Sequence, residues 1–158
     1  MIDCDRAMLL RMLLSELQAW EAPLEISERA RSREGARIGL LYRAGEWEAA
    51  HGVAQDLKSA EGSFWHGILH RQEGDWGNAA YWFRRVGQHA VYPAIREDAV
   101  RILKGEPVAG WRLRGEWDAV QFVGWCEQAS GQPGAAAERA VVKMQVAEFQ
   151  HLFDWCVG

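Results

Sequence analysis

Residues 63–87 read SFWHGILHRQEGDWGNAAYWFRRVG, and this stretch predicts two helices joined by a short turn. Apolar side chains recur at helical spacing on both sides of Gly74, a residue that tolerates the left-handed or tight backbone at the end of a helix. The acidic Asp75 suits the positive start of a following helix. The stretch therefore predicts an antiparallel helical hairpin with helices over residues 62–73 and 75–87.

The same short pattern occurs three times along the chain, as Gly45-Glu46-Trp47, Gly74-Asp75-Trp76 and Gly115-Glu116-Trp117. Small alanines follow each copy, and they would let two helices approach closely while the tryptophan pins the corner. Each copy is therefore expected at one kind of corner between helices. The pattern resembles the tetratricopeptide repeat, whose second helix opens with a Gly-acidic-aromatic turn.

The middle copy shows this resemblance best. In the register of the family, Gly67 takes the small position of the first helix, Ala79 the small position of the second, and Phe83 the large aromatic position. The copies stand 29 and 41 residues apart rather than the roughly 34 of the family, and the third copy has Val120 and Gly124 where a small and a large residue are expected. The resemblance implies a degenerate, tetratricopeptide-like helical array.

The same stretch also resembles the signature of an uncharacterised family of bacterial proteins with relatives in fungi. The resemblance lies in the letters FWHGILHR, EGD and NAAYWFRRVG, which cover residues 64–71, 73–75 and 78–87. It implies where a functional site lies and does not imply a particular activity.

Helical periodicity also dominates the rest of the chain, and no alternating pattern typical of strands is present. Residues 105–115 and 130–134 are expected as loops because they combine glycine with proline. The broad apolar surface of the last helix predicts a central position or an interface. Pro23 is expected to end the first helix, which covers residues 3–20. The further expected helices cover residues 46–58, 94–104, 116–130 and 134–156. We therefore expect a single all-α domain over residues 1–158, an array of antiparallel helical hairpins with about seven or eight helices.

Composition excludes several classes of protein. The chain has 158 residues and a net charge of −4, and 49% of its residues are hydrophobic, which suits one globular domain with a sizeable core. Basic and acidic residues are interspersed, so there is no basic stripe for nucleic acid. The longest apolar run is the five residues 79–83, and neither a membrane span nor a signal peptide is expected. Three widely separated cysteines give no disulfide framework, so we expect a cytoplasmic protein without a nucleic-acid or membrane partner.

The predicted hairpin carries the densest polar chemistry of the chain. His66 and His70 are four residues apart and Glu73 follows at seven, so these side chains project from one face of a helix, with Asp75 just beyond. Two histidines at this spacing can chelate a divalent metal ion while a carboxylate completes the shell. The competing interpretation is that both imidazoles are buried, hydrogen-bonded groups. A metal site of His66, His70 and Glu73 therefore stands as an alternative, and His51 joins it only if the preceding hairpin folds against this one.

The second helix of the hairpin has a polar and aromatic side in addition to its packing side. This side carries Asn78, Tyr81, Trp82 and Arg85. An aromatic pair beside an amide and a guanidinium suits an anionic or peptide group, because arginine binds carboxylates and phosphates with two parallel hydrogen bonds. The other interpretation is that this side packs against a neighbouring helix, with an arginine paired to the acids of the turn.

These features favour a non-enzymatic binding or scaffold module that recognises a peptide or protein segment, or a small anionic ligand, through residues 62–87. No cofactor is expected for such a module. Its expected ligand contacts are Trp65, His66, His70, Arg71, Asn78, Trp82 and Arg85. The first alternative is a small-molecule or metal-dependent enzyme whose polar side chains converge in a pocket: His51, His66, His70, Glu73 and Asp75. The second is a structural homo-oligomer that uses exposed aromatic residues and the last helix as its interface.

Overall fold

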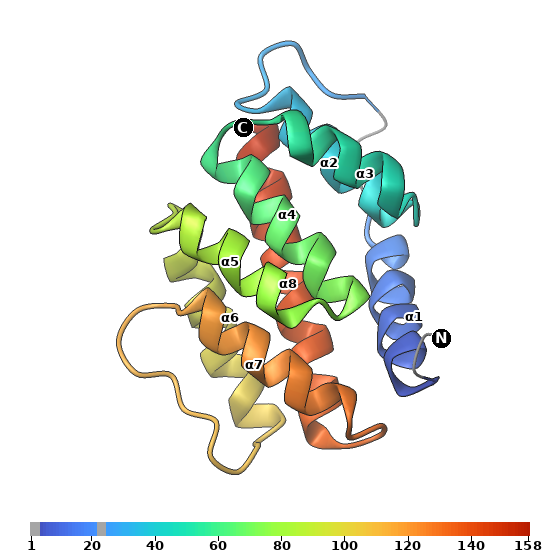
Figure 1. Cartoon of the computed structure of the whole chain (residues 1–158). Coiled ribbons are helices and arrows are strands. Elements are labelled where there is room, and N and C mark those ends of the chain that lie inside the picture. Colours follow the sequence, from blue (N-terminus) through green and yellow to red (C-terminus); the bar gives the residue numbers. More distant parts are fainter. Residues whose placement is uncertain (1–3, 22–24) are drawn as a thin grey trace.

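Eight α-helices make up the fold in the computed structural model, which describes residues 4–21 and 25–158, with side chains from residue 11 onward (Figure 1). Within these residues there is no β-strand. The helices are α1 (Cys4–Ala19), α2 (Arg33–Arg43), α3 (Trp47–Asp56), α4 (Ala60–Glu73), α5 (Trp76–Val86), α6 (Tyr92–Gly105), α7 (Ala119–Ser130) and α8 (Ala136–Val157). The predicted all-α class with about seven or eight helices is confirmed.

The predicted helix ranges agree with the observed ones to within a few residues at each end. The helix for which no range was predicted is α2. It begins after Ser32, whose hydroxyl oxygen accepts a hydrogen bond from the backbone N–H of Gly35 at 3.1 Å and so caps the helix. Pro23, which was expected to end the first helix, lies outside the described residues.

Helix α8 runs through the middle of the molecule, behind α4 in Figure 1, and packs against α1, α2, α6 and α7. Its buried aromatic residues Phe149 and Phe153 meet Trp20 and Trp65 in the core. The predicted central position of the last helix is therefore confirmed. Although α8 is the longest helix, neither it nor any other helix in the described ranges combines the length and apolar character that a membrane crossing requires.

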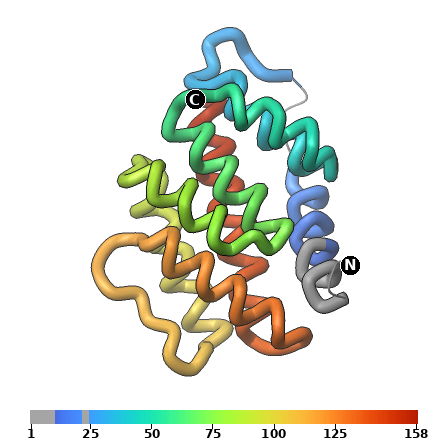
Figure 2. Tube along the Cα trace, viewed as in Figure 1, coloured from blue at the N-terminus to red at the C-terminus, as the bar shows by residue number. Residues whose placement is uncertain are grey.

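The end of α8 lies beside the start of α2, as the meeting of the red and cyan parts of the trace shows (Figure 2). The backbone N–H of Ser32 donates to the carbonyl oxygen of Cys156 at 2.8 Å. The thiol of Cys156 packs so closely against α2 that a side-chain carbon added at Gly35 would lie 2.7 Å from its sulfur. These contacts hold the end of α8 against the start of α2.

The first two copies of the Gly-acidic-Trp pattern form the predicted corners. Gly45 and Gly74 adopt left-handed backbone conformations, with φ of 83° and 72°, between α2 and α3 and between α4 and α5. Helices α4 and α5 then pack so closely that a side-chain carbon added at Gly67 would lie 2.8 Å from the ring of Phe83. The predicted pairing of a small residue with a large aromatic one is confirmed at this hairpin.

The third copy does not form a corner between two helices, so that prediction is wrong. Gly115 has the expected left-handed backbone, with φ of 71°, but α6 already ends at Gly105 and a long connection separates it from α7. This connection is held by Trp111, whose ring stacks on Trp125 at 4.7 Å. The residue that caps α7 is Asp118 and not Glu116, the acid of the third copy. Helix α6 packs on α8 and α5 packs on α7, so sequential stacking of hairpins ends after α5.

Candidate functional site

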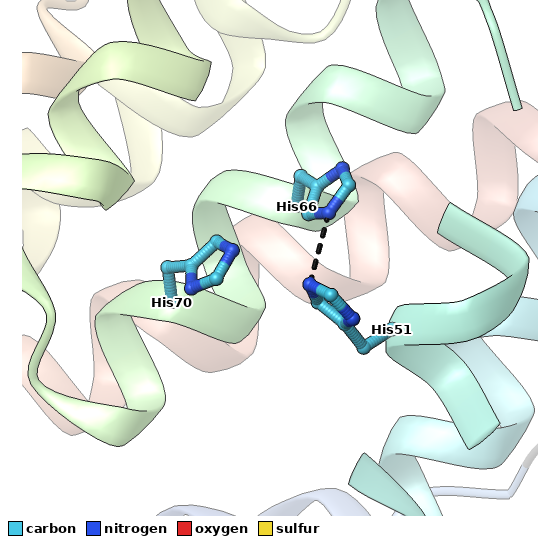
Figure 3. A group of neighbouring side chains, drawn as sticks. All are labelled: His51, His66 and His70. Carbon is cyan, nitrogen blue, oxygen red and sulfur yellow. Dashed lines mark hydrogen bonds between the residues drawn. The ribbon is translucent and has the colours of Figure 1, made fainter. Parts of the chain in front are cut away.

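Three consecutive helices bring together most of the predicted site residues. His51 comes from α3, His66 and His70 come from α4, and Asn78 and Trp82 come from the facing side of α5. The condition for recruiting His51 is met, because α3 packs against α4. The three imidazoles point toward one another (Figure 3). We call His51, His66 and His70 the histidine cluster.

The imidazoles of the histidine cluster are in direct contact. Nε2 of His66 lies 3.1 Å from Nε2 of His51, a hydrogen bond in which one ring carries the proton and the other accepts it. The rings of His66 and His70 stack in parallel with centroids 5.4 Å apart, as expected for residues one helical turn apart. The ring of His51 meets both of them edge-on. One nitrogen from each ring lies within 4.8 Å of one nitrogen from each of the others.

Two tryptophans form the walls of the histidine cluster. The Trp82 ring stacks on His66 with centroids 4.0 Å apart, and the Trp47 ring stacks on His51 at 4.8 Å. Trp47 is fixed in place because its indole N–H donates to the carbonyl oxygen of Leu69 at 2.9 Å. Sequence reasoning had placed Trp47 only at a corner of the fold and missed this second role. The repeated Gly-acidic-Trp pattern, four residues before His51, is the signal that could have found it.

The remaining polar residues of the turn hold His70. Nδ1 of His70 lies 2.8 Å from a carboxylate oxygen of the exposed Glu73, and Nε2 lies 3.3 Å from the side-chain nitrogen of Asn78. Because the amide nitrogen of Asn78 is a donor, Nε2 of His70 is the accepting nitrogen and Nδ1 carries the proton that Glu73 accepts. Asp75 instead caps α5 by accepting from the backbone N–H of Asn78 at 3.2 Å.

The surroundings keep two members of the histidine cluster neutral at neutral pH. Burial is the largest cause that lowers the pKa of His66, and together with the neighbouring His51, His70 and Lys58 it brings this pKa to about 4. Burial and the proximity of His70 also lower the pKa of His51, and Glu73 opposes this shift. A neutral imidazole has one nitrogen lone pair that can accept a hydrogen bond or bind a metal ion.

Two predicted ligand contacts lie on the other side of α4. Trp65 is fully buried and packs edge-on against Phe149 of α8 with ring centroids 5.4 Å apart. Arg71 is buried and donates from both terminal nitrogens to the carboxylate of Glu148, with Nη1 3.2 Å from Oε2. Neither side chain reaches the histidine cluster, because on a helix these positions turn away from residues 66 and 70.

The partner of Arg71 was missed by sequence reasoning. Glu148 lies 77 positions further along the chain, on α8 and next to the core residue Phe149. Its fully buried carboxylate and the neighbouring bond between the amides of Gln72 and Gln145, at 2.8 Å, form a polar layer between α4 and α8. An acid within the apolar side of the last helix was the available signal, since a buried carboxylate requires a cationic partner.

A pocket of about 280 Å³ opens beside the histidine cluster, between the α3–α4 connection and α5. The side chains of Lys58, Ser63, Trp82 and Arg85 line it. The guanidinium of Arg85 lies over the rings of Trp82 and Tyr81, with its central carbon 5.5 Å and 5.8 Å from the two centroids. Among the described residues Arg85 has no carboxylate within ion-pair distance, so the predicted alternative of a salt bridge to the turn acids is not observed.

Comparison with known proteins gives no match to a family model, to a curated protein or to a solved structure. The functional argument therefore rests on the side chains that α3, α4 and α5 bring together.

Proposed function

We propose that the protein is a small binding module that holds an anionic group, a carboxylate or a phosphate, in the pocket beside Arg85. The observation that carries the proposal is the arrangement of Arg85 itself. It is exposed, lies over two aromatic rings at the edge of a pocket, and has no acidic partner among the described residues.

The chemistry of the pocket suits an anion. Arg85 can donate two parallel hydrogen bonds to a carboxylate or phosphate, and cation–π contacts with Tyr81 and Trp82 favour its position at the edge of the pocket. Lys58 also lines the pocket and adds a second positive charge. The acid in the first turn of α4, Glu61, faces elsewhere and pairs with His89 at 3.2 Å.

Trp82 lines the pocket and Tyr81 packs edge-on against it, so the two rings offer a surface for the rest of the ligand. Tyr81 is 50% exposed and is the single large hydrophobic side chain that is strongly exposed among the described residues. Rigid aromatic rings provide contact area at low entropic cost, so a peptide side chain or the body of a small molecule can lie against them. The shared chemistry of both ligand classes is the anionic group.

The test is a titration of the protein with inorganic phosphate, with acetate, and with a short peptide carrying phosphoserine or unmodified serine. The indole N–H resonance of Trp82 in a nitrogen–proton correlation spectrum reports occupancy of the pocket. We expect a saturable shift with an anion, and a dissociation constant raised about tenfold or more in Arg85→Gln because a charge-assisted hydrogen bond is lost. The matched control is Arg84→Gln, since Arg84 is equally exposed on the same helix but lines another pocket.

The arms of this experiment separate the sources of the anion. A phosphopeptide that binds much more tightly than free phosphate, and than its unmodified form, identifies a peptide ligand, while equal affinities identify a small molecule. A Trp82 resonance that none of the anions moves, or an Arg85→Gln protein that binds as the unaltered protein does, would overturn the proposal.

A further inference from the structure

We infer that His51, His66 and His70 form a binding site for a transition-metal dication of the zinc type. This site is separate from the anion pocket, because neither Lys58 nor Arg85 belongs to it. Trp82 lies between the two sites, but the groups that would hold the metal ion and the anion come from different side chains, so the two proposals fail independently.

The spacing of the ring nitrogens is close to that of metal ligands. Two nitrogen ligands at the usual zinc–nitrogen distance on a tetrahedral ion stand about 3.3 Å apart. The Nε2 atoms of His51 and His66 already lie 3.1 Å apart, and a nitrogen of His70 lies within 4.8 Å of both residues' ligand atoms. A movement of the His70 ring toward the other two rings, which it faces in Figure 3, would complete a three-nitrogen site.

His70 is already oriented as a metal ligand would be. Metal-binding histidines usually donate their second ring N–H to a carboxylate or carbonyl group, which fixes the tautomer and the direction of the lone pair. Glu73 plays this part for His70, with 2.8 Å between Nδ1 and the carboxylate oxygen. The lone pair on Nε2 then accepts only the long hydrogen bond of 3.3 Å from the side-chain amide of Asn78. A metal ion bound to Nε2 would replace this hydrogen bond.

The histidine cluster is not saturated by hydrogen bonds from the chain. Nδ1 of His66 is buried and has no partner among the described residues, although most buried polar atoms in proteins have one. His51 and His66 share one proton between two facing Nε2 atoms.

The donor set defines the class of metal. Imidazole donors suit zinc, copper, nickel and iron, whereas calcium and magnesium prefer oxygen ligands. Three protein ligands leave the fourth position of a tetrahedral ion to water or to an exchangeable ligand.

The first test is a calorimetric titration of the chelator-treated protein with zinc chloride. The second is a titration with cobalt chloride, in which the visible absorption of the bound cobalt reports four-coordinate geometry. We expect one equivalent to bind. His51→Gln should raise the dissociation constant at least about tenfold, and Glu73→Gln should raise it about tenfold by releasing His70. His51 is only partly buried, so its replacement is expected to leave the circular dichroism of the fold unchanged.

The matched control is His151→Gln, because His151 is a partly buried histidine that pairs with Asp98 at 2.6 Å, away from the cluster. It should bind zinc as the unaltered protein does. Arg85→Gln should also keep zinc binding, which distinguishes failure of this proposal from failure of the anion pocket. Absence of stoichiometric binding, or equal affinity in a folded His51→Gln protein, would overturn the metal site.

Discussion

Helix α4 carries two groups of polar side chains on opposite sides, and the two groups are built differently. On the side that faces α8, Arg71 and Gln72 are buried and meet Glu148 and Gln145. On the side that faces α3 and α5, His66 and His70 are also buried, but the partly exposed His51 contacts them and a pocket lined by Trp82 adjoins the histidine cluster. We call the first the closed side of α4 and the second its open side.

The difference separates a structural role from a ligand-binding one within a single helix. On the closed side a guanidinium meets a carboxylate through two hydrogen bonds, and Phe122 covers it with its ring centroid 4.9 Å from the guanidinium carbon. Burial alone would lower the pKa of Arg71, but the charge and hydrogen bonds of Glu148 raise it above its usual value. Both pairs on the closed side join side chains of α4 to side chains of α8, although Nε of Arg71 and the side-chain nitrogen of Gln145 have no hydrogen-bond partner among the described residues. The open side differs because a pocket adjoins it.

The largest effect is expected from breaking the ion pair on the closed side. Arg71→Met leaves the carboxylate of Glu148 buried without a partner, which should lower the free energy of unfolding by about 3 to 5 kcal/mol. Urea denaturation followed by circular dichroism measures it. The double variant Arg71→Met with Glu148→Leu should recover most of the loss, because no charge is then left buried. A single variant that loses less than about 1 kcal/mol would show that the closed side is not the structural one.

Sequence reasoning recovered what depends on neighbours in the chain. Helix periodicity, the left-handed glycine at position 74 and the small residue at position 67 are local signals, and each led to a correct feature of the α4–α5 hairpin. The spacing of His66 and His70 likewise placed both on one face of a helix. The convergence of His51 depended on how two hairpins pack, which the sequence left open.

The pairing of Arg71 with Glu148 could not be predicted for the same reason, although the acid on the apolar side of the last helix signalled that a cationic partner was needed. Nothing near Arg71 in the sequence indicates that its partner lies 77 residues away on α8, so an exposed, ligand-binding role was as consistent with the sequence as a buried one. The third copy of the Gly-acidic-Trp pattern failed through a different cause. A local motif specifies the backbone of a turn, but it does not specify whether a helix precedes that turn. At Gly115 the preceding residues form a connection held by the stacked rings of Trp111 and Trp125.

A smaller effect is expected from protonating the open side. The pKa of His66 is about 4 in the folded chain and about 6.5 when unfolded, so between these values the unfolded chain binds more protons. The free energy of unfolding should therefore fall as the pH drops from 7 to 4.5, by about 1 to 2 kcal/mol from this group. His51, His70 and Lys58 face the same ring and act in the same direction.

Comparison with His66→Phe isolates this contribution, because phenylalanine keeps the stacking on Trp82 and does not titrate. Urea denaturation in the presence of a chelator, at pH 7 and pH 4.5, should show a smaller pH dependence in the variant. Equal pH dependence in both proteins would mean that His66 accepts a proton in the folded state as readily as in water. Burial would then not disfavour the charged form of His66, and the open side would resemble the solvent-exposed surface in this respect.

The smallest effect is expected at Asp75, where the open side meets the turn. Asp75 lies near His70 and Glu73 and, from position alone, could belong to a metal shell, but its carboxylate caps α5. Asp75→Ala should cost about 1 kcal/mol of unfolding free energy, the usual price of a lost cap. At the equivalent corner Glu46 makes no capping bond, so Glu46→Ala should change stability by less than about 0.5 kcal/mol.

Zinc affinity separates the two roles of an acid at this turn. If Asp75 is only a cap, Asp75→Ala should bind zinc within about twofold of the unaltered protein, whereas Glu73→Gln should lose about tenfold because Glu73 orients a ligand directly. An equal loss in both variants would extend the ligand site of the open side to the start of α5. Asp75 would then belong to the ligand-binding residues of the hairpin and would not be only a structural cap.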